Sequence, residues 1–540
     1  MGSSRGFFWM CLFALWLKAE SAQAYVLTGQ VTNGTNGLSG VSVAAGTNLT
    51  TTDVNGYYSF TNLSGTFLVT PSKAGQVFNP LRQALTMPPG LSNINFVEGI
   101  TNITTIVASC DRPSLAAAAA LGGLVEFGCN GDLLLTTQLT IATNLVLNGT
   151  YHQITLDGGG TSQIATITAT NVTVGLYNLV LSNSVGAIVD APLPGTPDHG
   201  VLNISGCTFV NNQSTAGAAI FNGVTLNVAN STFLRNGYPN GSGYTGLVLG
   251  GAIFNDNNAA ATIIGSTFAS NTIVVSVNAL NGEGGAIDNE GGANLILVNC
   301  TFVGNYVYAS PESGTAMNID GTAVFNFAGS IALTNCTLAG NRFAQSPTED
   351  PAVLGESAGG RIALRACAFG QGNSYIFDSA TPFTDAGYNI AFTLLGNGNS
   401  FTNPTSRTAT DPLLGPLADN GGPTMTCSLL PGSPALDAIT NGYYPGTDQR
   451  GFTRPYGKAA DIGALEYYPD TFTITSLIAT GADWRVQGNG FPLTTYLLQA
   501  SSNLASWFAV QTNITGPSGL FDSLDTTGEA PRRFYRTSAP

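Results

Sequence analysis

Gly284-Gly-Ala-Ile-Asp-Asn289 and, just after it, Leu295-Ile-Leu-Val-Asn-Cys-Thr-Phe-Val-Gly-Asn305 form one unit of an internal repeat. The first half returns, with small changes, at Gly217, Gly250 and Gly321. The second half returns around an apolar anchor residue at intervals of 24 to 36 residues, at Leu181, Phe209, Phe233, Phe268, Phe302, Leu338 and Phe369. Self-similarity at such a period is typical of a solenoid.

Each repeat has a fixed pattern around its anchor. Aliphatic residues stand five positions before it, at Leu176, Ile204, Val228, Ile263, Leu297, Leu333 and Leu364. Asn stands three positions after five of the anchors, at Asn212, Asn236, Asn271, Asn305 and Asn341. Alternation with period two indicates short strands, and columns of like residues require parallel coils stacked about 4.8 Å apart. We therefore predict a parallel β-helix over residues 99–467, in which stacked Asn amides satisfy the turn backbone.

The segments on either side of the repeats are also β-rich. Arg5, an apolar run and Ala22-Gln-Ala24 have the pattern of a signal peptide at residues 1–24. Residues 25–98 carry short alternating strands and predict a β-sandwich, and residues 468–540 predict a small C-terminal β module. The mature chain is therefore expected to be all-β and exported.

A short Ala-rich helix is predicted at 114–123, with Ser114 as its N-cap, where it would cover the open edge of the first coil. Cys110 and Cys129 flank this helix, and an oxidising compartment would allow them to form a disulfide. Four other cysteines stand two positions before an anchor and are expected in the core, not at a metal: Cys207, Cys300, Cys336 and Cys367.

The composition excludes several functions. Charged residues make up 9% of the 540 residues, the net charge is −14, and only three residues are Lys. A chain with so few cations has no basic face to neutralise phosphates, so nucleic-acid binding is not expected. No apolar run in the mature chain approaches the 18 residues of a transmembrane helix. We expect a monomer.

Two parts of the chain resemble known families. In residues 25–98, Gly29-Gln-Val-Thr, Gly40-Val-Ser-Val and Thr52-Asp-Val-Asn-Gly-Tyr-Tyr-Ser-Phe resemble the carboxypeptidase regulatory-like (Cna-B-like) domain. The repeats, together with the following five strings, resemble the bacterial "choice-of-anchor Q" family: Asp411-Pro-Leu-Leu-Gly, Ala418-Asp-Asn-Gly-Gly-Pro-Thr, Leu430-Pro-Gly-Ser-Pro-Ala-Leu-Asp, Thr447-Asp-Gln-Arg-Gly and Asp461-Ile-Gly-Ala-Leu-Glu. The second resemblance implies a right-handed parallel β-helix of the pectin-lyase-like type, displayed at the cell surface, with no established reaction. Residues 411–466 are expected to close its far end.

The strongest candidate site is a group of carboxylates. Aligning the Asn residues that end the Gly-Gly-Ala-Ile-x-Asn motifs stacks Asp256 over Glu290 on neighbouring coils, about 5 Å apart. Asp288 is two residues from Glu290, and Glu283 lies just upstream. Like charges this close share a proton or bind a cation, which makes calcium at Asp256, Asp288 and Glu290 one interpretation. A catalytic glycosidase pair and splayed, solvated carboxylates are the alternatives.

Aromatic residues form a second candidate site. In each Gly-Gly-Ala-Ile-x-Asn motif the residue x is expected to point away from the core, which places Phe254 and Phe325 in one outer column. The long loops between coils add four tyrosines: Tyr238, Tyr244, Tyr306 and Tyr308. Such rings could stack on sugars. The alternative is that the Phe column packs under the loops as a satellite core.

These features favour a non-catalytic protein that binds or displays, with extracellular polysaccharide or a cell-surface glycan as the expected ligand. The first alternative is an enzyme, a polysaccharide lyase or glycoside hydrolase working in the β-helix groove through Asp256, Asp288 and Glu290. The scarcity of Lys weakens the lyase hypothesis, because lyases of this fold use a Lys or Arg base. The second alternative is a purely structural stalk. No cofactor is required in any of these interpretations, apart from the possible calcium.

Overall fold

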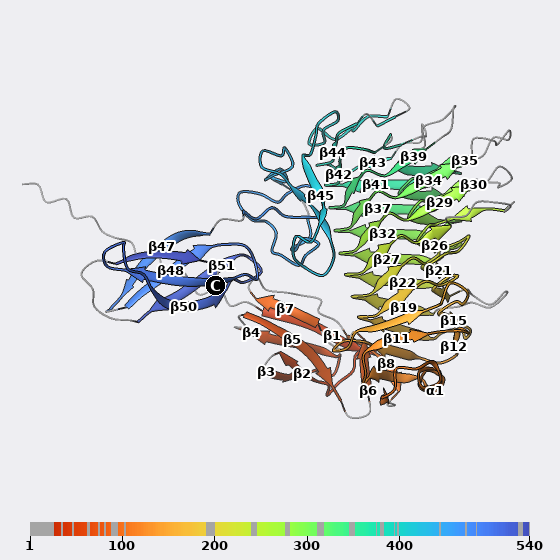
Figure 1. The fold of residues 1–540 in the computed structure, drawn as a ribbon, viewed down its shortest axis with the longest axis horizontal. Helices are drawn as coiled ribbons and strands as arrows, with labels where there is room; N and C mark the ends of the chain where they lie inside the picture. The colour runs from red at the N-terminus through yellow and green to blue at the C-terminus, as the bar shows by residue number, and fades with distance from the viewer. Residues whose placement is uncertain are drawn as a thin grey trace, which may run out of the picture. The chain divides into compact units, whose positions relative to one another are not determined.

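The computed structural model describes residues 26–538 apart from these gaps: 34–35, 46–47, 62–64, 74–75, 80–82, 88–95, 102–103, 191–199, 239–245, 276–280, 310–317, 345–351, 374, 378–382, 394, 397–398, 442–443, 470–471, 482 and 527–532. The predicted signal peptide lies outside the described residues. The fold of the described chain is all-β, as predicted, and the middle of the chain forms a parallel β-helix (Figure 1).

Three parallel sheets form the walls of the β-helix. The long sheet contains β9 (Thr104–Val107), β10 (Gly123–Phe127), β13 (Leu145–Asn148), β16 (Thr173–Tyr177), β19 (Val201–Ser205), β22 (Thr225–Ala229), β27 (Ala260–Ile264), β32 (Asn294–Val298), β37 (Ser330–Thr334), β41 (Arg361–Arg365) and β43 (Thr384–Asp385). The ten-stranded sheet contains β11 (Gly131–Leu134), β14 (Ile154–Asp157), β17 (Val180–Ser182), β20 (Thr208–Val210), β23 (Thr232–Leu234), β28 (Thr267–Ala269), β33 (Thr301–Val303), β38 (Thr337–Ala339), β42 (Ala368–Phe369) and β44 (Ile390–Ala391). The eight-stranded sheet contains β12 (Leu139–Ile141), β15 (Ala165–Ile167), β18 (Ile188–Asp190), β21 (Ile220–Asn222), β26 (Ile253–Asn255), β31 (Ile287–Asn289), β36 (Val324–Phe327) and β40 (Leu354–Ser357).

The predicted columns of like residues are present inside this helix. The rings of Phe209, Phe233, Phe268 and Phe302 stack with centroids 4.6 to 5.0 Å apart and planes within 4° of parallel. The cysteines before the anchors are buried free thiols, as expected for core residues. Burial of these side chains from every coil in one continuous core supplies the main stabilisation of the solenoid.

Two ladders of Asn amides run along the stack. In one, each side-chain NH₂ donates to the next carbonyl oxygen, from Asn212 through Asn236, Asn271, Asn305 and Asn341 to Asn373. The same NH₂ groups also donate to main-chain carbonyls, for example Asn271 Nδ2 to Phe233 O at 3.0 Å. The second ladder runs in the same direction through Asn222, Asn255, Asn289 and Asn326. The ladders satisfy turn backbone that the core would otherwise leave unpaired.

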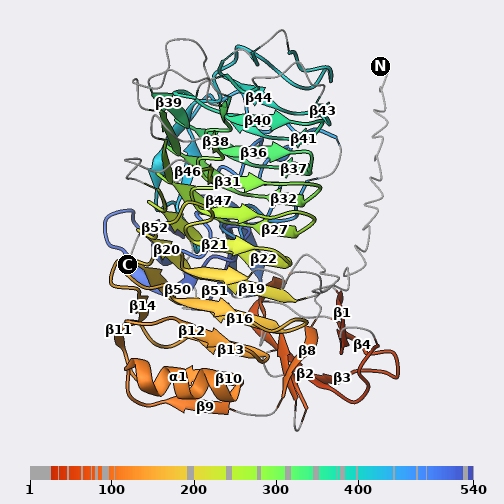
Figure 2. The same cartoon turned by 90° about the vertical axis from the view of Figure 1, so that its right-hand side faces the viewer.

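The helix α1 (Arg112–Leu121) packs on β9, β10 and β12 at one end of the stack (Figure 2). It begins two residues earlier than predicted, and its N-cap is Asp111, not Ser114. The Asp111 carboxylate accepts the Ser114 amide at 2.8 Å, and Pro113 suits the first turn because its position needs no N–H donor. Cys110 and Cys129 form a disulfide with their Cα atoms 5.8 Å apart.

Two outer sheets extend the coils beyond the three walls and pack against each other. The outer four-stranded sheet contains β24 (Gly237–Tyr238), β29 (Thr272–Val275), β34 (Tyr306–Ala309) and β39 (Arg342–Ala344). The outer three-stranded sheet contains β25 (Val248–Leu249), β30 (Asn281–Glu283) and β35 (Asn318–Asp320). Both are parallel and continue the register of the coils. The sequence suggested only long loops here.

Residues 411–466, with β45 (Leu414–Ala418) and β46 (Thr426–Leu429), lie along the turns between the long and ten-stranded sheets. The segment packs on the last coils, where Ile390 shares an apolar cluster with Leu429 and Ile462, but it also runs along the side of the stack, which the prediction of a closing end did not include. Asn299 Nδ2 donates to Thr447 O at 2.8 Å, and Gln449 Nε2 donates to Thr267 Oγ1 at 2.8 Å. Turn amides and strand hydroxyls of several coils thus hold the segment to one corner.

The contacts divide the chain into two compact units, Met1–Lys73 with Pro80–Val97, and Ala74–Asn79 with Glu98–Pro540. The described strands of the first module are β1 (Val26–Thr32), β2 (Ser42–Ala45), β3 (Asn48–Thr51), β4 (Tyr57–Thr61), β5 (Gly65–Ser72), β7 (Gln83–Met87) and β8 (Phe96–Thr101), with β6 (Gln76–Asn79) assigned to the second unit. Antiparallel pairing of β1 with β4 and of β2 with β3 and β5 gives this module its sheets.

The C-terminal module has two antiparallel three-stranded sheets. Their strands are β47 (Thr473–Thr480), β48 (Asp483–Asn489), β49 (Thr495–Ser501), β50 (Phe508–Ile514), β51 (Leu520–Asp525) and β52 (Phe534–Ser538). A small core of Val486, Leu498 and Phe521 lies between these strands. In the part of the chain that the structure describes, no helix has the length and apolar character needed to cross a bilayer.

Candidate functional site

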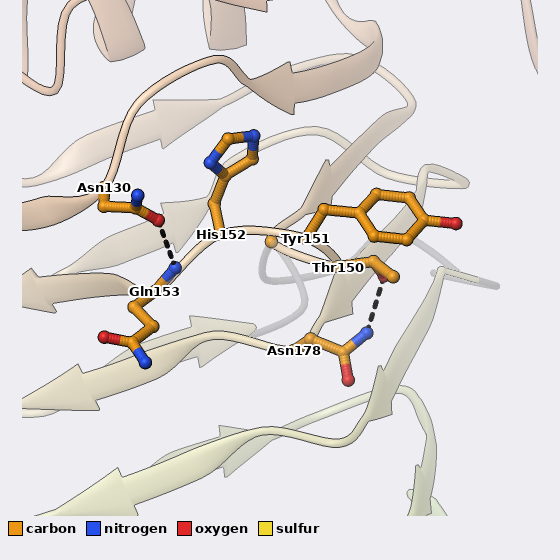
Figure 3. Close-up of a pocket in the computed structure, with 7 residues that line it drawn as sticks. Asn130, Thr150, Tyr151, His152, Gln153 and Asn178 are labelled. Carbon is orange, nitrogen blue, oxygen red and sulfur yellow. Dashed lines mark hydrogen bonds between the residues drawn. The ribbon is translucent and has the colours of Figure 1, made fainter.

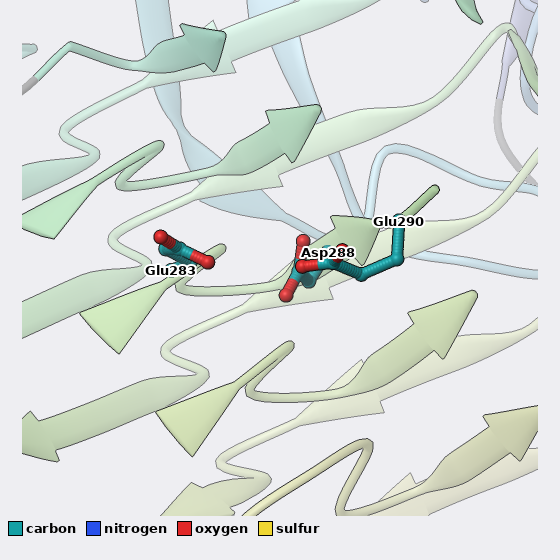
Figure 4. Close-up of side chains that lie close together, drawn as sticks. All are labelled: Glu283, Asp288 and Glu290. Carbon is teal, nitrogen blue, oxygen red and sulfur yellow. The ribbon is translucent and has the colours of Figure 1, made fainter. Parts of the chain in front are cut away.

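Three carboxylates meet between the eight-stranded sheet and the outer three-stranded sheet (Figure 4). Glu283 ends β30, Asp288 is the middle residue of β31, and Glu290 follows β31. One oxygen from each lies within 4.8 Å of the others. Asp288 is 0% exposed, Glu283 is 6% exposed and Glu290 is half-buried. The arrangement is therefore an acidic cluster, mostly closed to water.

The register of the coils explains how these side chains meet. Asp288 pairs with Phe254 on one side and Phe325 on the other, so it occupies the outer column of the eight-stranded sheet. Glu283 pairs with Leu249 and Asp320 in the outer three-stranded sheet. One coil therefore carries two carboxylates where the coil before it carries Leu249 and Phe254. Side chains on a parallel ladder repeat along the stack, so this substitution stands out against its neighbours.

Burial and mutual repulsion disfavour three negative charges at this place. Burial, and then the charge of Glu290, raise the pKa of Glu283 from 4.5 to about 7. Burial, followed by the charges of Glu290 and Glu283, raises the pKa of Asp288 well above its ordinary range. Burial and the charge of Asp256 raise the pKa of Glu290. The cluster must therefore take up protons or a cation at neutral pH.

The carboxylate cluster differs by one residue from the predicted calcium site: it contains Glu283 in place of Asp256. Asp256 stacks in register with Glu290, as expected, but its carboxylate turns to the amide and side chain of Asn257, at 2.7 and 2.8 Å. Glu283 takes its place in the cluster, because the segment upstream of Gly284 forms the extra strand β30. The correction follows from secondary structure that the sequence pattern did not reveal.

The predicted aromatic surface is only partly present. Phe254 is 6% exposed and Phe325 is 2% exposed, so both rings pack as a satellite core and are not open to a ligand. Tyr238 aligns with the buried Ile273 and packs inward on the outer four-stranded sheet. Tyr244 lies outside the described residues.

Tyr306 and Tyr308 do share an outer face. They alternate with the buried Val307 on β34, and their ring centroids are 6.4 Å apart with planes 22° from parallel. Arg342 pairs with Tyr306 on the neighbouring strand and is exposed. Two half-buried rings beside a cation could contact a sugar face and an acidic group.

A depression of about 650 Å³ opens at the turns between the long and ten-stranded sheets near the first coils (Figure 3). Its lining comes from three successive coils: Asn130, then Gly149, Thr150, Tyr151, His152 and Gln153, then Asn178. Most later coils pass this corner in two residues, whereas β13 and β14 are joined by the five residues 149–153. The longer turn carries Tyr151, which is 77% exposed.

Hydrogen bonds hold the polar lining of the depression in place. The main-chain N–H of Gln153 donates to Asn130 Oδ1 at 2.8 Å, and Asn178 Nδ2 donates to Thr150 Oγ1 at 2.7 Å. These bonds use the oxygen of Asn130 and the NH₂ group of Asn178, whose oxygen points away from Thr150 toward Gly206 of the next coil (Figure 3). Sequence patterns did not predict this site, because its residues are ordinary turn residues that only the register of the coils brings together.

No known protein-family model matches the chain, and no curated protein matches it significantly.

Proposed function

We propose that this chain is an exported protein of the choice-of-anchor Q type that binds extracellular polysaccharide without altering it. The observation that carries the proposal is the open depression at Tyr151. Support for export comes from the signal-peptide pattern at 1–24 and from the Cys110–Cys129 disulfide, a bond typical of oxidising compartments. The family membership and the surface location are part of the proposal.

The depression has the chemistry of a shallow sugar site. Tyr151 offers an exposed ring face for the C–H face of a pyranose, and the exposed amide of Asn130 offers a hydrogen-bond donor to hydroxyls. Because the lining crosses three stacked coils, more than one sugar unit of a polymer could contact it. Neutral polar groups and a ring are better suited to hydroxyl-rich glycans than to phosphates.

The acidic cluster supports catalysis poorly. A glycosidase acid must touch the glycosidic oxygen, and a retaining pair must reach the sugar from both sides. Asp288 is 0% exposed and Glu283 is 6% exposed, so neither can contact a polymer in this structure. We therefore place ligand binding at the depression and assign the acidic cluster no catalytic role.

Affinity gel electrophoresis with xylan and polygalacturonate tests the proposal. We expect retardation of the full chain in at least one gel and a roughly five- to tenfold weaker effect for Tyr151→Ala, equivalent to about 1 kcal/mol of stacking. Tyr57→Ala, at another exposed tyrosine, is the matched control and should not change the retardation. Tyr306→Ala/Tyr308→Ala tests the rival surface.

The outcomes separate the hypotheses. Loss of binding in the Tyr306/Tyr308 variant alone would move the site to the outer four-stranded sheet. Release of reducing ends or unsaturated products, abolished in carboxylate variants, would contradict a non-catalytic role. Absence of retardation across neutral and acidic glycans would leave the structural stalk.

A further inference from the structure

We infer that Glu283, Asp288 and Glu290 bind one Ca²⁺ ion that joins the outer three-stranded sheet to the β-helix wall. This site is separate from the polysaccharide site of the proposed function and does not depend on it. Its ligands come from β30, from β31 and from the residue after β31. One ion would therefore connect the outer layer and the inner coil through their side chains.

The carboxylate of Asp288 carries the argument beyond a simple cluster of acids. Among the described residues, neither of its oxygens has a hydrogen-bond partner, although the side chain is completely buried. The Asn289 amide lies near enough to lower its pKa slightly, but not in the geometry of a hydrogen bond. An ionised group buried in this way costs several kcal/mol unless a counter-charge is present. Its oxygens face the carboxylates of the cluster (Figure 4).

No side chain of the described residues supplies the counter-charge. The four ion pairs in the described parts of the chain involve other acids, namely Asp448, Glu466, Asp522 and Asp525. The closest further charges are themselves acidic: Asp256 acts on Glu290, and Asp320 is the register partner of Glu283. A bound cation would neutralise the cluster, and the local excess of negative charge would attract one.

The spacing favours calcium over magnesium. Two oxygens bound to one Ca²⁺ at 2.3–2.6 Å can lie up to about 5.2 Å apart, while two oxygens on one Mg²⁺ span at most about 4.2 Å. The three oxygens here lie within 4.8 Å of one another, so small side-chain shifts would bring them to calcium, whereas magnesium would require a larger movement. Three carboxylates can offer up to six oxygens, and the half-buried Glu290 leaves room for water in the remaining positions.

Calorimetric titration of the full-length protein, first dialysed against EGTA, tests the site. With CaCl₂ we expect one binding event per chain and a rise in Tm of at least ~2 °C at saturating ion, with a weaker response to MgCl₂. Asp288→Asn should abolish both signals. Glu290→Gln changes a half-buried side chain and should weaken calcium binding at least tenfold. This second variant still tests the site if Asp288→Asn does not fold.

Asp320→Asn is the matched control, because Asp320 is also a buried acid in the outer layer. Its carboxylate already accepts the amides of Gly321 and Ala352, at 2.7 and 3.3 Å, so this variant should lose stability but keep the calcium response. Wild-type protein that neither binds calcium nor gains stability from it would overturn the inference. Unchanged calcium binding in both Asp288→Asn and Glu290→Gln would also overturn it.

Discussion

Each of two neighbouring coils has one side chain on the outer three-stranded sheet and one on the eight-stranded sheet, a pair termed a rung. The two rungs have the same backbone pairing and opposite chemistry. The first, Leu249 of β25 with Phe254 of β26, is apolar and buried. The second, Glu283 with Asp288, stands one coil further on and is acidic. The strands pair in the same register in both, so the backbone does not distinguish them.

The contrast shows which positions specify this fold and which are open to specialisation. The inner columns and the Asn ladders repeat from coil to coil because each side chain must match the one above it. A side chain at an outer position does not have to match the one in the next coil. Its chemistry can therefore change in one rung while the solenoid remains intact, and four variants test this.

The largest effect is expected from Phe254→Asp, which makes the apolar rung acidic. The variant loses a buried ring and gains a buried charge, so we expect it to lose ~4–5 kcal/mol of unfolding free energy. Urea denaturation measures the loss. Position 254 is the register neighbour of Asp288, so the new charge also repels the acidic rung. Calcium bound at the acidic rung should restore only part of the stability, and full recovery with calcium would contradict the distinction between the rungs.

The pH dependence of the acidic rung comes next. The pKa of Glu283 is raised to about 7, so its protonated form is favoured in the folded state. In EGTA, this stabilisation should be complete below about pH 4.5 and be lost as the pH rises through 7, a change on the order of 3 kcal/mol. Thermal melts of wild type and Glu283→Gln between pH 5 and 8 isolate the effect as the difference in Tm. A difference that stays constant with pH would count against the raised pKa, and one that calcium leaves unchanged at pH 8 would count against the bound ion.

Exchanging the chemistry of the rungs should have a smaller and opposite effect. Glu283→Leu/Asp288→Phe copies the apolar rung into the acidic one. Replacing buried charges by packed apolar groups should stabilise the EGTA-treated protein by ~2 kcal/mol and remove any calcium response. Differential scanning calorimetry with and without calcium measures both. A destabilised variant would show that the outer layer does not tolerate this exchange.

The smallest effect is expected at Asp256→Asn. Asp256 raises the pKa of Glu290 but does not contribute to the three-oxygen cluster. Removing its charge should weaken calcium binding only about two- to fourfold, through a partly screened interaction. Loss of calcium binding as complete as in Asp288→Asn would make Asp256 a ligand instead.

The inner part of the fold was predictable, because stacking leaves a direct trace in sequence. The Phe stack and five members of the first Asn ladder follow from the spacing around each anchor. Asn373 was missed, since it stands four residues after Phe369 instead of three, with its NH₂ group also bonded to Gly370 O. The position of residues 411–466 could not be inferred, because its hydrogen bonds to the middle coils join residues more than 120 positions apart, and its apolar contacts with the last coils follow no repeat.

The candidate site was predictable only where it belongs to the repeat. Asp288 and Glu290 lie in or directly after the Gly-Gly-Ala-Ile-x-Asn motif, so register alone brings them together. Glu283 comes from β30, whose pairing with β25 and β35 has no repeating signal in the sequence. The burial of Phe254 and Phe325 could not be predicted either, because it depends on the segments that cover this column, and those segments have no repeating signal in the sequence.

The two Asn ladders give the stack a polarity. Every amide donates toward the following coil, so a coil entering in the reverse sense would set donor against donor at one face and acceptor against acceptor at the other. A coil in the correct sense, by contrast, donates to the next coil just as the coil before it donated to it. We therefore expect that a whole coil can be added to or removed from the ladder with its amide bonds formed again, which would make the length of the stack adjustable in steps of about 4.8 Å.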